Sequence, residues 1–217
     1  MEAFLFYVVP LFCGIAFLAS LTVYFGPPAE LCLRLFPVYL LLDCTIQGIN
    51  NYNALHRHNT VLLSSLSYLI PFCFDIYFLR AVIRNPKAKR ILLYCLVAFP
   101  LIFIVNIFLV QKFLVFQSLN YCFDCLVIVA ACIYYFWEVF QSKNYVNLVR
   151  EPAFWICSGL LFFCATSFPV YGLINFIKNI DFAVILIMLY VLGFVNILLY
   201  LSFTIAFLCR LRTRKSL

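Results

Sequence analysis

Three aspartates lie inside long apolar segments of this 217-residue chain, and they are the side chains best suited to chemistry. Asp43, Asp75 and Asp124 are each flanked mainly by apolar residues. An ionised carboxylate in lipid costs at least about 2.5 kcal/mol, so such a group normally faces the interior of a helix bundle. There it has a partner or stays protonated, which is typical of ion, proton or ligand sites.

Further polar side chains recur beside two of these acids, and in the last two apolar segments, at spacings of three and four residues. Such spacings place side chains on one face of a helix. We therefore expect a ligand or ion pocket in the outer half of a bundle. Hydrogen bonding between helices is the alternative explanation of the same residues. The predicted pocket residues are Asp43, Gln47, Gln117, Asn120, Asp124, Tyr171, Asn175 and Asn196.

Asp75 differs from the other two acids because arginines lie within reach of it. Arg80 follows it by five positions, and Arg34 lies near the predicted cytoplasmic end of the preceding apolar segment. We predict a structural ion pair between Asp75 and one of these arginines. Asp75 is then expected to hold the bundle together rather than to bind a ligand.

The sequence contains no recognisable catalytic or cofactor-binding pattern. No histidine lies in an apolar segment, so bis-histidine haem ligation and a membrane Ser/His pair are unsupported. His56 and His58 share a predicted outer loop without a further histidine to complete a metal site. No Walker motif or kinase signature is present. We predict a non-enzymatic protein without a metal or a cofactor.

The composition indicates which elements must position these residues. Hydrophobic residues make up 67% of the chain and charged residues 11%, against about 45–50% and about 25% in soluble domains. We predict an all-α fold, a polytopic membrane helix bundle in one domain covering residues 1–217. Seven apolar segments are long enough to cross about 30 Å of lipid. They cover residues 3–25, 30–50, 61–83, 91–111, 113–140, 152–177 and 182–209. Because only Gln111 and Lys112 separate the fourth segment from the fifth, six helices are the alternative.

The basic residues indicate an orientation. With seven spans, one side of the membrane receives twelve of the 15 Lys and Arg residues, and the other receives Arg57, Lys112 and Lys178. Cytoplasmic loops carry the excess of Lys and Arg, so we predict an outer N-terminus and a cytoplasmic C-terminus in the cell inner membrane. Membrane topology and anionic lipids account for the net charge of +7, and no nucleic-acid partner is expected.

The eleven cysteines all fall inside the apolar segments or at the end of one. Small, polarizable cysteine side chains suit packing in such segments. We therefore predict no structural disulfide.

The segment from Leu148 to Phe163, LVREPAFWICSGLLFF, carries a resemblance to a known group of proteins. It resembles a recurring part of bacterial seven-helix membrane proteins of the sensor histidine kinase type, which occur fused to kinases or beside them. Pro152, Phe154, Trp155, Ile156 and Gly159 match the pattern. Because seven residues follow Arg210, the resemblance implies a stand-alone membrane domain. A membrane histidine kinase or another signalling protein would then be its separate partner.

These observations favour a sensory or signalling membrane module with a polar pocket in its outer half. Three alternatives stay open. A small transporter or channel subunit would use the intramembrane aspartates as carriers. A structural subunit of a larger membrane complex would direct the polar faces towards its neighbours. A membrane enzyme acting on lipid is the last. Besides the lipid bilayer and the signalling partner that the resemblance implies, the sequence specifies no partner, and it specifies no oligomeric state.

Overall fold

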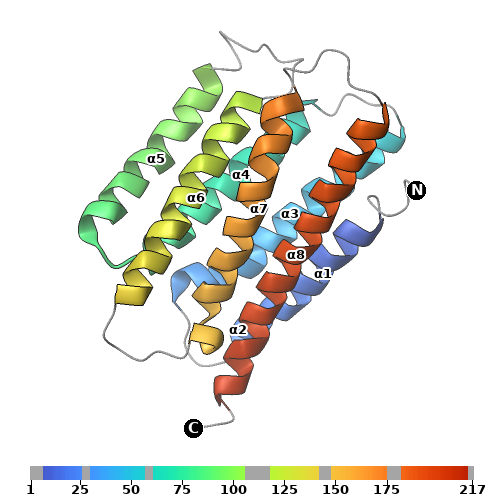
Figure 1. Cartoon of the computed structure of the whole chain (residues 1–217). Coiled ribbons are helices and arrows are strands. Elements are labelled where there is room, and N and C mark those ends of the chain that lie inside the picture. The colour runs from blue at the N-terminus through green and yellow to red at the C-terminus, as the bar shows by residue number, and fades with distance from the viewer. Residues whose placement is uncertain are drawn as a thin grey trace.

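The computed structural model describes residues 7–25, 30–56, 61–105, 118–141, 148–174 and 182–214. Within these ranges every regular element is helical, as the sequence predicts (Figure 1). Seven helices have twelve or more residues, and one lies in each predicted apolar segment. They are α1 (Val9–Ser20), α3 (Leu31–Leu55), α4 (Val61–Val82), α5 (Pro86–Val105), α6 (Ser118–Gln141), α7 (Pro152–Ile174) and α8 (Phe182–Arg214), accompanied by the short α2 (Thr22–Phe25) and the 3-10 turn η3 (Leu148–Arg150).

Five of the helices in the described residues are long and apolar enough to cross a membrane, namely α3, α5, α6, α7 and α8. The apolar stretch Val9–Phe25, which contains α1 and α2, is shorter. Helix α4 is not among the five, and its sequence carries Asp75, Arg80 and several serines. The fold is therefore a helical bundle of membrane-like composition.

Several helices begin or end at residues that hydropathy alone does not indicate. Helix α5 starts at Pro86 rather than at residue 91, because the side-chain Oδ1 of Asn85 accepts a hydrogen bond from the Lys87 N–H at 2.9 Å. Asparagine before a helix and proline in its first turn are both favourable there. Helix α3 continues past residue 50 to Leu55, and α8 continues past residue 209 to Arg214. Hydropathy marks where lipid is tolerated, whereas the helical hydrogen bonds continue beyond it.

The first apolar segment is not one continuous helix. Helix α1 ends at Ser20, Leu21 follows as its cap, and α2 resumes at Thr22. Helices α5 and α6 are separate, and the junction predicted near Gln111 lies outside the described residues.

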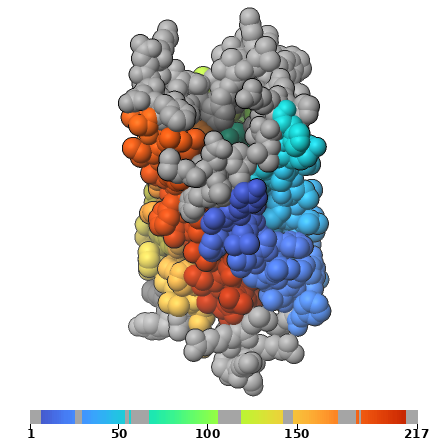
Figure 2. Space-filling view, turned by 90° about the vertical axis from the view of Figure 1, so that its right-hand side faces the viewer, coloured from blue at the N-terminus to red at the C-terminus, as the bar shows by residue number. Residues whose placement is uncertain are grey.

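Six of the helices close into a ring, in which α1 contacts α3, α3 contacts α4, α4 contacts α6, α6 contacts α7, α7 contacts α8, and α8 contacts α1. Helix α5 packs against α4 outside this ring (Figure 1). Seen from the side, α1 covers the seam between α3 and α8 (Figure 2). The ring topology brings residues far apart in sequence to a common interior.

The two ends of the bundle differ. We call one the cavity end, because a cavity lies in that half of the bundle, and the other the basic end, because Lys and Arg gather there. At the cavity end, α1, α4, α6 and α8 begin and α3, α5 and α7 end. At the basic end, α3, α5 and α7 begin and α4, α6 and α8 end. Ten Lys or Arg positions of the described helices and turns lie at or near the basic end, namely 34, 80, 84, 87, 89, 90, 150, 210, 212 and 214.

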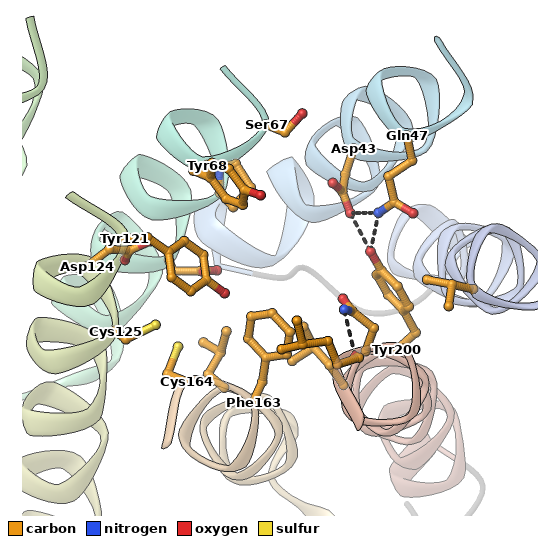
Figure 3. A pocket seen from close by; sticks show the side chains of 18 of the residues that line it. Asp43, Gln47, Ser67, Tyr68, Tyr121, Asp124, Cys125, Phe163, Cys164 and Tyr200 are labelled. Atoms are coloured by element: carbon orange, nitrogen blue, oxygen red, sulfur yellow. Dashed lines mark hydrogen bonds between the residues drawn. The ribbon is translucent and has the colours of Figure 1, made fainter. Parts of the chain in front are cut away.

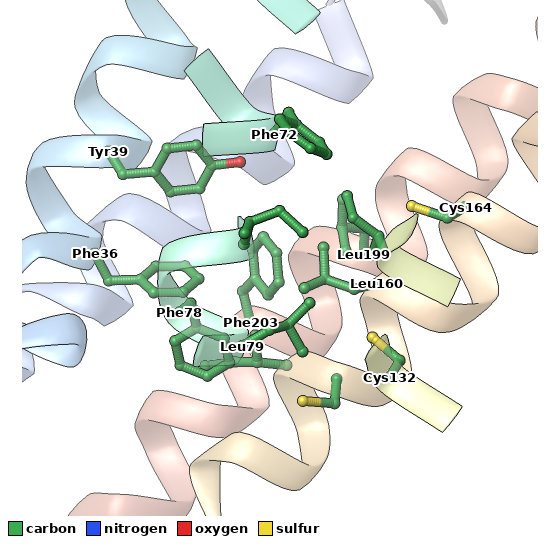
Figure 4. Packing of buried hydrophobic residues seen from close by; sticks show 14 of the residues in the cluster. Phe36, Tyr39, Phe72, Phe78, Leu79, Cys132, Leu160, Cys164, Leu199 and Phe203 are labelled. Atoms are coloured by element: carbon green, nitrogen blue, oxygen red, sulfur yellow. The ribbon is translucent and has the colours of Figure 1, made fainter. Parts of the chain in front are cut away.

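Inside the ring, the half at the basic end is filled by a closely packed aromatic core (Figure 4). Phe36 of α3 is fully buried, and its ring meets Phe203 and Phe207 of α8 edge-on at centroid distances of 5.0 and 5.2 Å. Phe78 of α4 completes the contact at 6.0 Å. Edge-to-face packing of this kind suits aromatic rings and leaves few voids.

Large apolar side chains also cover the outside of the bundle. On α5, the exposed fractions are 66% for Tyr94, 60% for Val97 and 60% for Leu101. A water-soluble protein rarely presents such a continuous apolar surface. Lipid is the solvent in which that surface is stable.

Candidate functional site

A cavity of about 380 Å³ lies inside the ring, in the half at the cavity end (Figure 3). Its wall is made mainly by the second halves of α3 and α7 and by the first halves of α1, α4, α6 and α8, and it reaches the middle of the bundle at Tyr39, Asp75 and Tyr200. Asp43, Asp75 and Asp124 all line it. Pockets for small ligands have volumes of about 300–1,000 Å³ and are mainly apolar with a few polar groups. This cavity matches that description.

The carboxyl group of Asp43 is held by a hydrogen-bond network between α3 and α8 (Figure 3). Its Oδ2 accepts hydrogen bonds from the Tyr200 hydroxyl at 2.7 Å and from Gln47 Nε2 at 3.0 Å. Gln47 Nε2 also donates to the Tyr200 hydroxyl, and the Cys13 thiol approaches the same oxygen at 3.9 Å. Asp43 is therefore a well-satisfied acid in a fixed position.

No hydrogen bond of this kind reaches Asp75 or Asp124 from the described residues. Both are buried, with exposed fractions of 5% and 6%. The Oδ1 atom of Asp124 has no hydrogen-bond partner in the described part of the chain. The charges that act on Asp124 and Asp75 come from another aspartate or a thiol, and none comes from an arginine or lysine among the described residues. These two carboxyl groups have acceptor capacity that no described residue uses.

The three acids share one neighbourhood rather than three unrelated packing sites. Asp43 acts electrostatically on Asp75, and Asp75 acts on Asp124. Tyr39 of α3 interacts with all three carboxyl groups. The ring of Tyr39 stacks on Phe74 with centroids 4.2 Å apart, which holds the tyrosine in place.

Three tyrosines from different helices form another part of the wall. Tyr121 of α6 lies 4.9 Å from Tyr68 of α4 and 4.3 Å from Tyr171 of α7, measured between ring centroids. All three line the cavity. Helices α4, α6 and α7 thus meet through aromatic rings at the level of the acids.

Asn50 and Ser67 line the cavity close to the cavity end of the bundle. Asn50 Nδ2 donates to Ser67 Oγ at 2.9 Å and links α3 to α4. The Oδ1 atom of Asn50 is buried without a hydrogen-bond partner among the described residues. A second unused acceptor therefore lies on the cavity wall.

The structure brings together five of the eight predicted pocket residues, since Asp43, Gln47, Asp124, Tyr171 and Asn196 line the cavity. Asn196 also donates from Nδ2 to the Leu192 carbonyl at 3.0 Å. Asn120 is buried on α6 but is not part of the cavity wall. Gln117 and Asn175 lie outside the described residues.

The predicted ion pair of Asp75 is not seen among the described residues. Neither Arg80 nor Arg34 acts electrostatically on Asp75, and Arg80 Nε is buried without a hydrogen-bond partner in the described part of the chain. Five residues of α-helix turn through about 500°, so Arg80 points about 140° away from Asp75. Asp75 faces the cavity instead.

Several wall residues were not among the predicted pocket residues. Tyr39 precedes Asp43 by four positions, Tyr121 precedes Asp124 by three, and Tyr68 precedes Asp75 by seven. These spacings put each tyrosine on the helix face of its acid. Helical spacing around the acids is the signal that could have found them.

The described residues do not bring three His, Cys, Asp or Glu side chains together as metal ligands. All eleven cysteines are free thiols. Cys125 and Cys164 line the cavity from α6 and α7, where their sulfur atoms lie towards each other (Figure 3).

Comparison with known proteins does not identify a relative. No protein-family model matches the chain, and no curated protein or solved structure is significantly similar to it.

Proposed function

We propose that the chain is a non-enzymatic, multi-pass membrane protein that binds a small ligand in its cavity and serves as a sensory module. The observation that carries this proposal is the cavity itself, which gathers Asp43, Asp75 and Asp124 inside an otherwise apolar bundle. Acids buried among membrane helices are expensive and usually functional. Two acceptor atoms of its lining residues, Asp124 Oδ1 and Asn50 Oδ1, have no hydrogen-bond partner among the described residues, which supports a ligand-binding role.

The aromatic core favours a receptor over an open channel. Phe36, Phe78, Phe203 and Phe207 fill the ring in the half at the basic end. Among the described residues, these side chains block the approach to the cavity from the basic end. A ligand that enters would stop at this core, as expected for a binding site with one entrance.

The orientation that we propose has seven spans in the inner membrane. The N-terminus lies outside, and the basic end lies on the cytoplasmic side. The support is the concentration of Lys and Arg at that end. Trp137 and Trp155 also lie there, at the depth where indoles are stable in a bilayer. A reporter that works only in the cytoplasm should then be active when it is fused to the C-terminus. Activity of a reporter that works only in the periplasm, fused at the same place, would refute the orientation.

Signalling requires a route from the cavity to the cytoplasmic side, and we assign this route to α7, which extends from the cavity to the basic end. Its second half lines the cavity with Tyr171, and its first turns hold Trp155, whose Nε1 donates to the Val149 carbonyl at 2.9 Å. The resemblance of this segment to sensor-type proteins supports a separate partner, such as a membrane histidine kinase, at the basic end.

The proposal is tested by filling the cavity. Gly193 is buried on α8 and lines the cavity, so Gly193→Leu should occupy ligand space. Purified protein in lipid nanodiscs should bind a small probe such as benzyl alcohol or benzylamine, and the filled variant should lose that binding. Gly14→Ala is the control, because nothing lies within 4 Å of the added carbon. Equal binding by the filled variant, verified as monodisperse, would refute the assignment of the cavity.

A small transporter is the second candidate, since three electrostatically connected carboxyl groups could carry a cation or a proton. Flux into liposomes separates the two. A proton or sodium flux that Asp124→Asn abolishes would favour transport over sensing.

A further inference from the structure

We infer that the ligand of this cavity is a small organic cation whose ammonium group is held between Asp75 and Asp124. The inference rests on the proposed function and specifies the chemical class of the ligand. It begins from the charge of the wall. Among the lining residues that the structure describes, three are acidic and none is Lys, Arg or His.

The three acids have different roles. Asp43 already accepts hydrogen bonds from Tyr200 and Gln47, so its position is fixed by the protein. Asp75 and Asp124 lie beyond that network, and Asp124 Oδ1 is buried without a partner in the described part of the chain. A buried polar atom normally has a partner, and its absence requires an explanation. An incoming hydrogen-bond donor supplies one.

A cationic donor suits this pair better than a neutral one. Two neighbouring carboxyl groups cannot both ionise in a low-dielectric interior unless a positive charge lies between them. Hydrogen bonds between an ammonium group and a carboxylate are shorter and about twice as strong as neutral ones. The cation would therefore be bound together with the ionisation of at least one of the two acids.

The tyrosines reinforce the preference for a cation. Tyr68, Tyr121 and Tyr171 present aromatic rings to the cavity, and Tyr39 interacts with all three acids. Aromatic faces attract ammonium groups, most strongly where water is excluded. Acids and aromatic rings on one wall form the surroundings that alkylammonium ions favour.

The size and lining of the cavity point to an organic cation rather than a bare ion. A volume of about 380 Å³ is in the range of pockets for small molecules. Leu160, Phe163, Leu192 and Leu199 contribute an apolar surface that a hydrocarbon group can cover. The unused Oδ1 of Asn50 adds a second acceptor. The best-fitting ligand is thus an amine with an apolar body and a second hydrogen-bond donor.

The test compares three probes that differ in charge on the same ring: benzylamine, benzyl alcohol and benzoate. Each is titrated by calorimetry into the full chain in lipid nanodiscs at neutral pH. We expect benzylamine to bind at least about tenfold more tightly than benzyl alcohol, and benzoate not to bind. Tyramine, which adds a hydroxyl donor, should bind more tightly than phenethylamine.

Two variants assign the effect to the acids. Asp124→Asn and Asp75→Asn should each weaken benzylamine at least about tenfold and leave benzyl alcohol unchanged. Glu151→Gln is the matched control, because it removes an exposed acid at the basic end. Binding of benzyl alcohol also shows that each variant is folded.

The outcomes separate this inference from the proposed function. Equal affinity for amine and alcohol, lost together in Gly193→Leu, would overturn the cation and leave the cavity as a binding site. Amine binding that persists in both aspartate variants would overturn the role of Asp75 and Asp124. No binding of any probe would contradict the inference and the proposed function together.

Discussion

The hydroxyl of Tyr200 donates a 2.7 Å hydrogen bond to the carboxyl group of Asp43 and so joins α8 to α3 on the cavity side of the aromatic core. The two residues are 157 positions apart in sequence. Their bond fixes one wall of the cavity, whereas Asp124 on another part of the wall has an Oδ1 atom without a partner among the described residues.

Replacing Tyr200 by Phe should destabilise the bundle by about 1–2 kcal/mol, because Asp43 loses a buried donor. Denaturant unfolding in detergent micelles measures the change. Tyr94→Phe is the control, since Tyr94 is 66% exposed on α5. A Tyr200→Phe protein as stable as this control would show that the bond is not part of the structure.

Gly159 allows α7 to approach α8 closely. A Cβ atom at Gly159 would lie 2.8 Å from Ser202 Cβ and 3.3 Å from Leu199 Cδ1. Gly159→Ala should therefore cost about 1–3 kcal/mol through overpacking. Gly14→Ala meets nothing within 4 Å and should gain up to about 1 kcal/mol from helix propensity.

A compensating variant makes the prediction specific. The two nearest atoms belong to the side chain of Ser202, so Ser202→Gly combined with Gly159→Ala should recover part of the lost stability. If the double variant is no more stable than Gly159→Ala, the close approach of α7 and α8 at this point is incorrect.

Glu138 of α6 anchors the connection between α4 and α5. Its Oε2 accepts from the Arg84 N–H at 2.7 Å, and its Oε1 accepts from the Asn85 N–H at 2.8 Å. Glu138→Ala should remove both acceptors, cost about 1–3 kcal/mol and speed hydrogen exchange at these two amides. Glu138→Gln keeps one acceptor oxygen and should show a smaller effect. Unchanged exchange in Glu138→Ala would contradict the anchor.

The helices were predictable because hydropathy reports directly on lipid exposure. Their ends were less so, since they depend on local hydrogen bonds. The Asn85 side chain and Pro86 start α5 early and place Lys87, Lys89 and Arg90 on helical turns instead of in a loop. Hydropathy averaged along the sequence does not detect a capping hydrogen bond of this kind.

The candidate site was predictable along each helix but not between helices. Gln47, four positions after Asp43, lines the cavity beside its acid, whereas Asn120, four positions before Asp124, does not line it. Proximity of Arg80 in sequence suggested a partner for Asp75, but the helical turn directs the two side chains apart. Which faces meet is decided by packing of the whole ring. Hence the shared neighbourhood of the three acids emerges only in the folded chain.

The most direct test of the central claim is to map which native cysteines react with a small cationic thiol reagent, methanethiosulfonate ethylammonium, in intact membranes. Cys125, Cys164, Cys132 and Cys157 have nearly equal exposed fractions of 1%, 3%, 0% and 0%, but only Cys125 and Cys164 line the cavity. Without benzylamine, peptide mass spectrometry should find Cys125 and Cys164 modified and Cys132 and Cys157 unmodified. With benzylamine present, Cys125 and Cys164 should be protected from modification. Equal protection of all four cysteines, or equal labelling, would contradict an accessible cavity above a packed core.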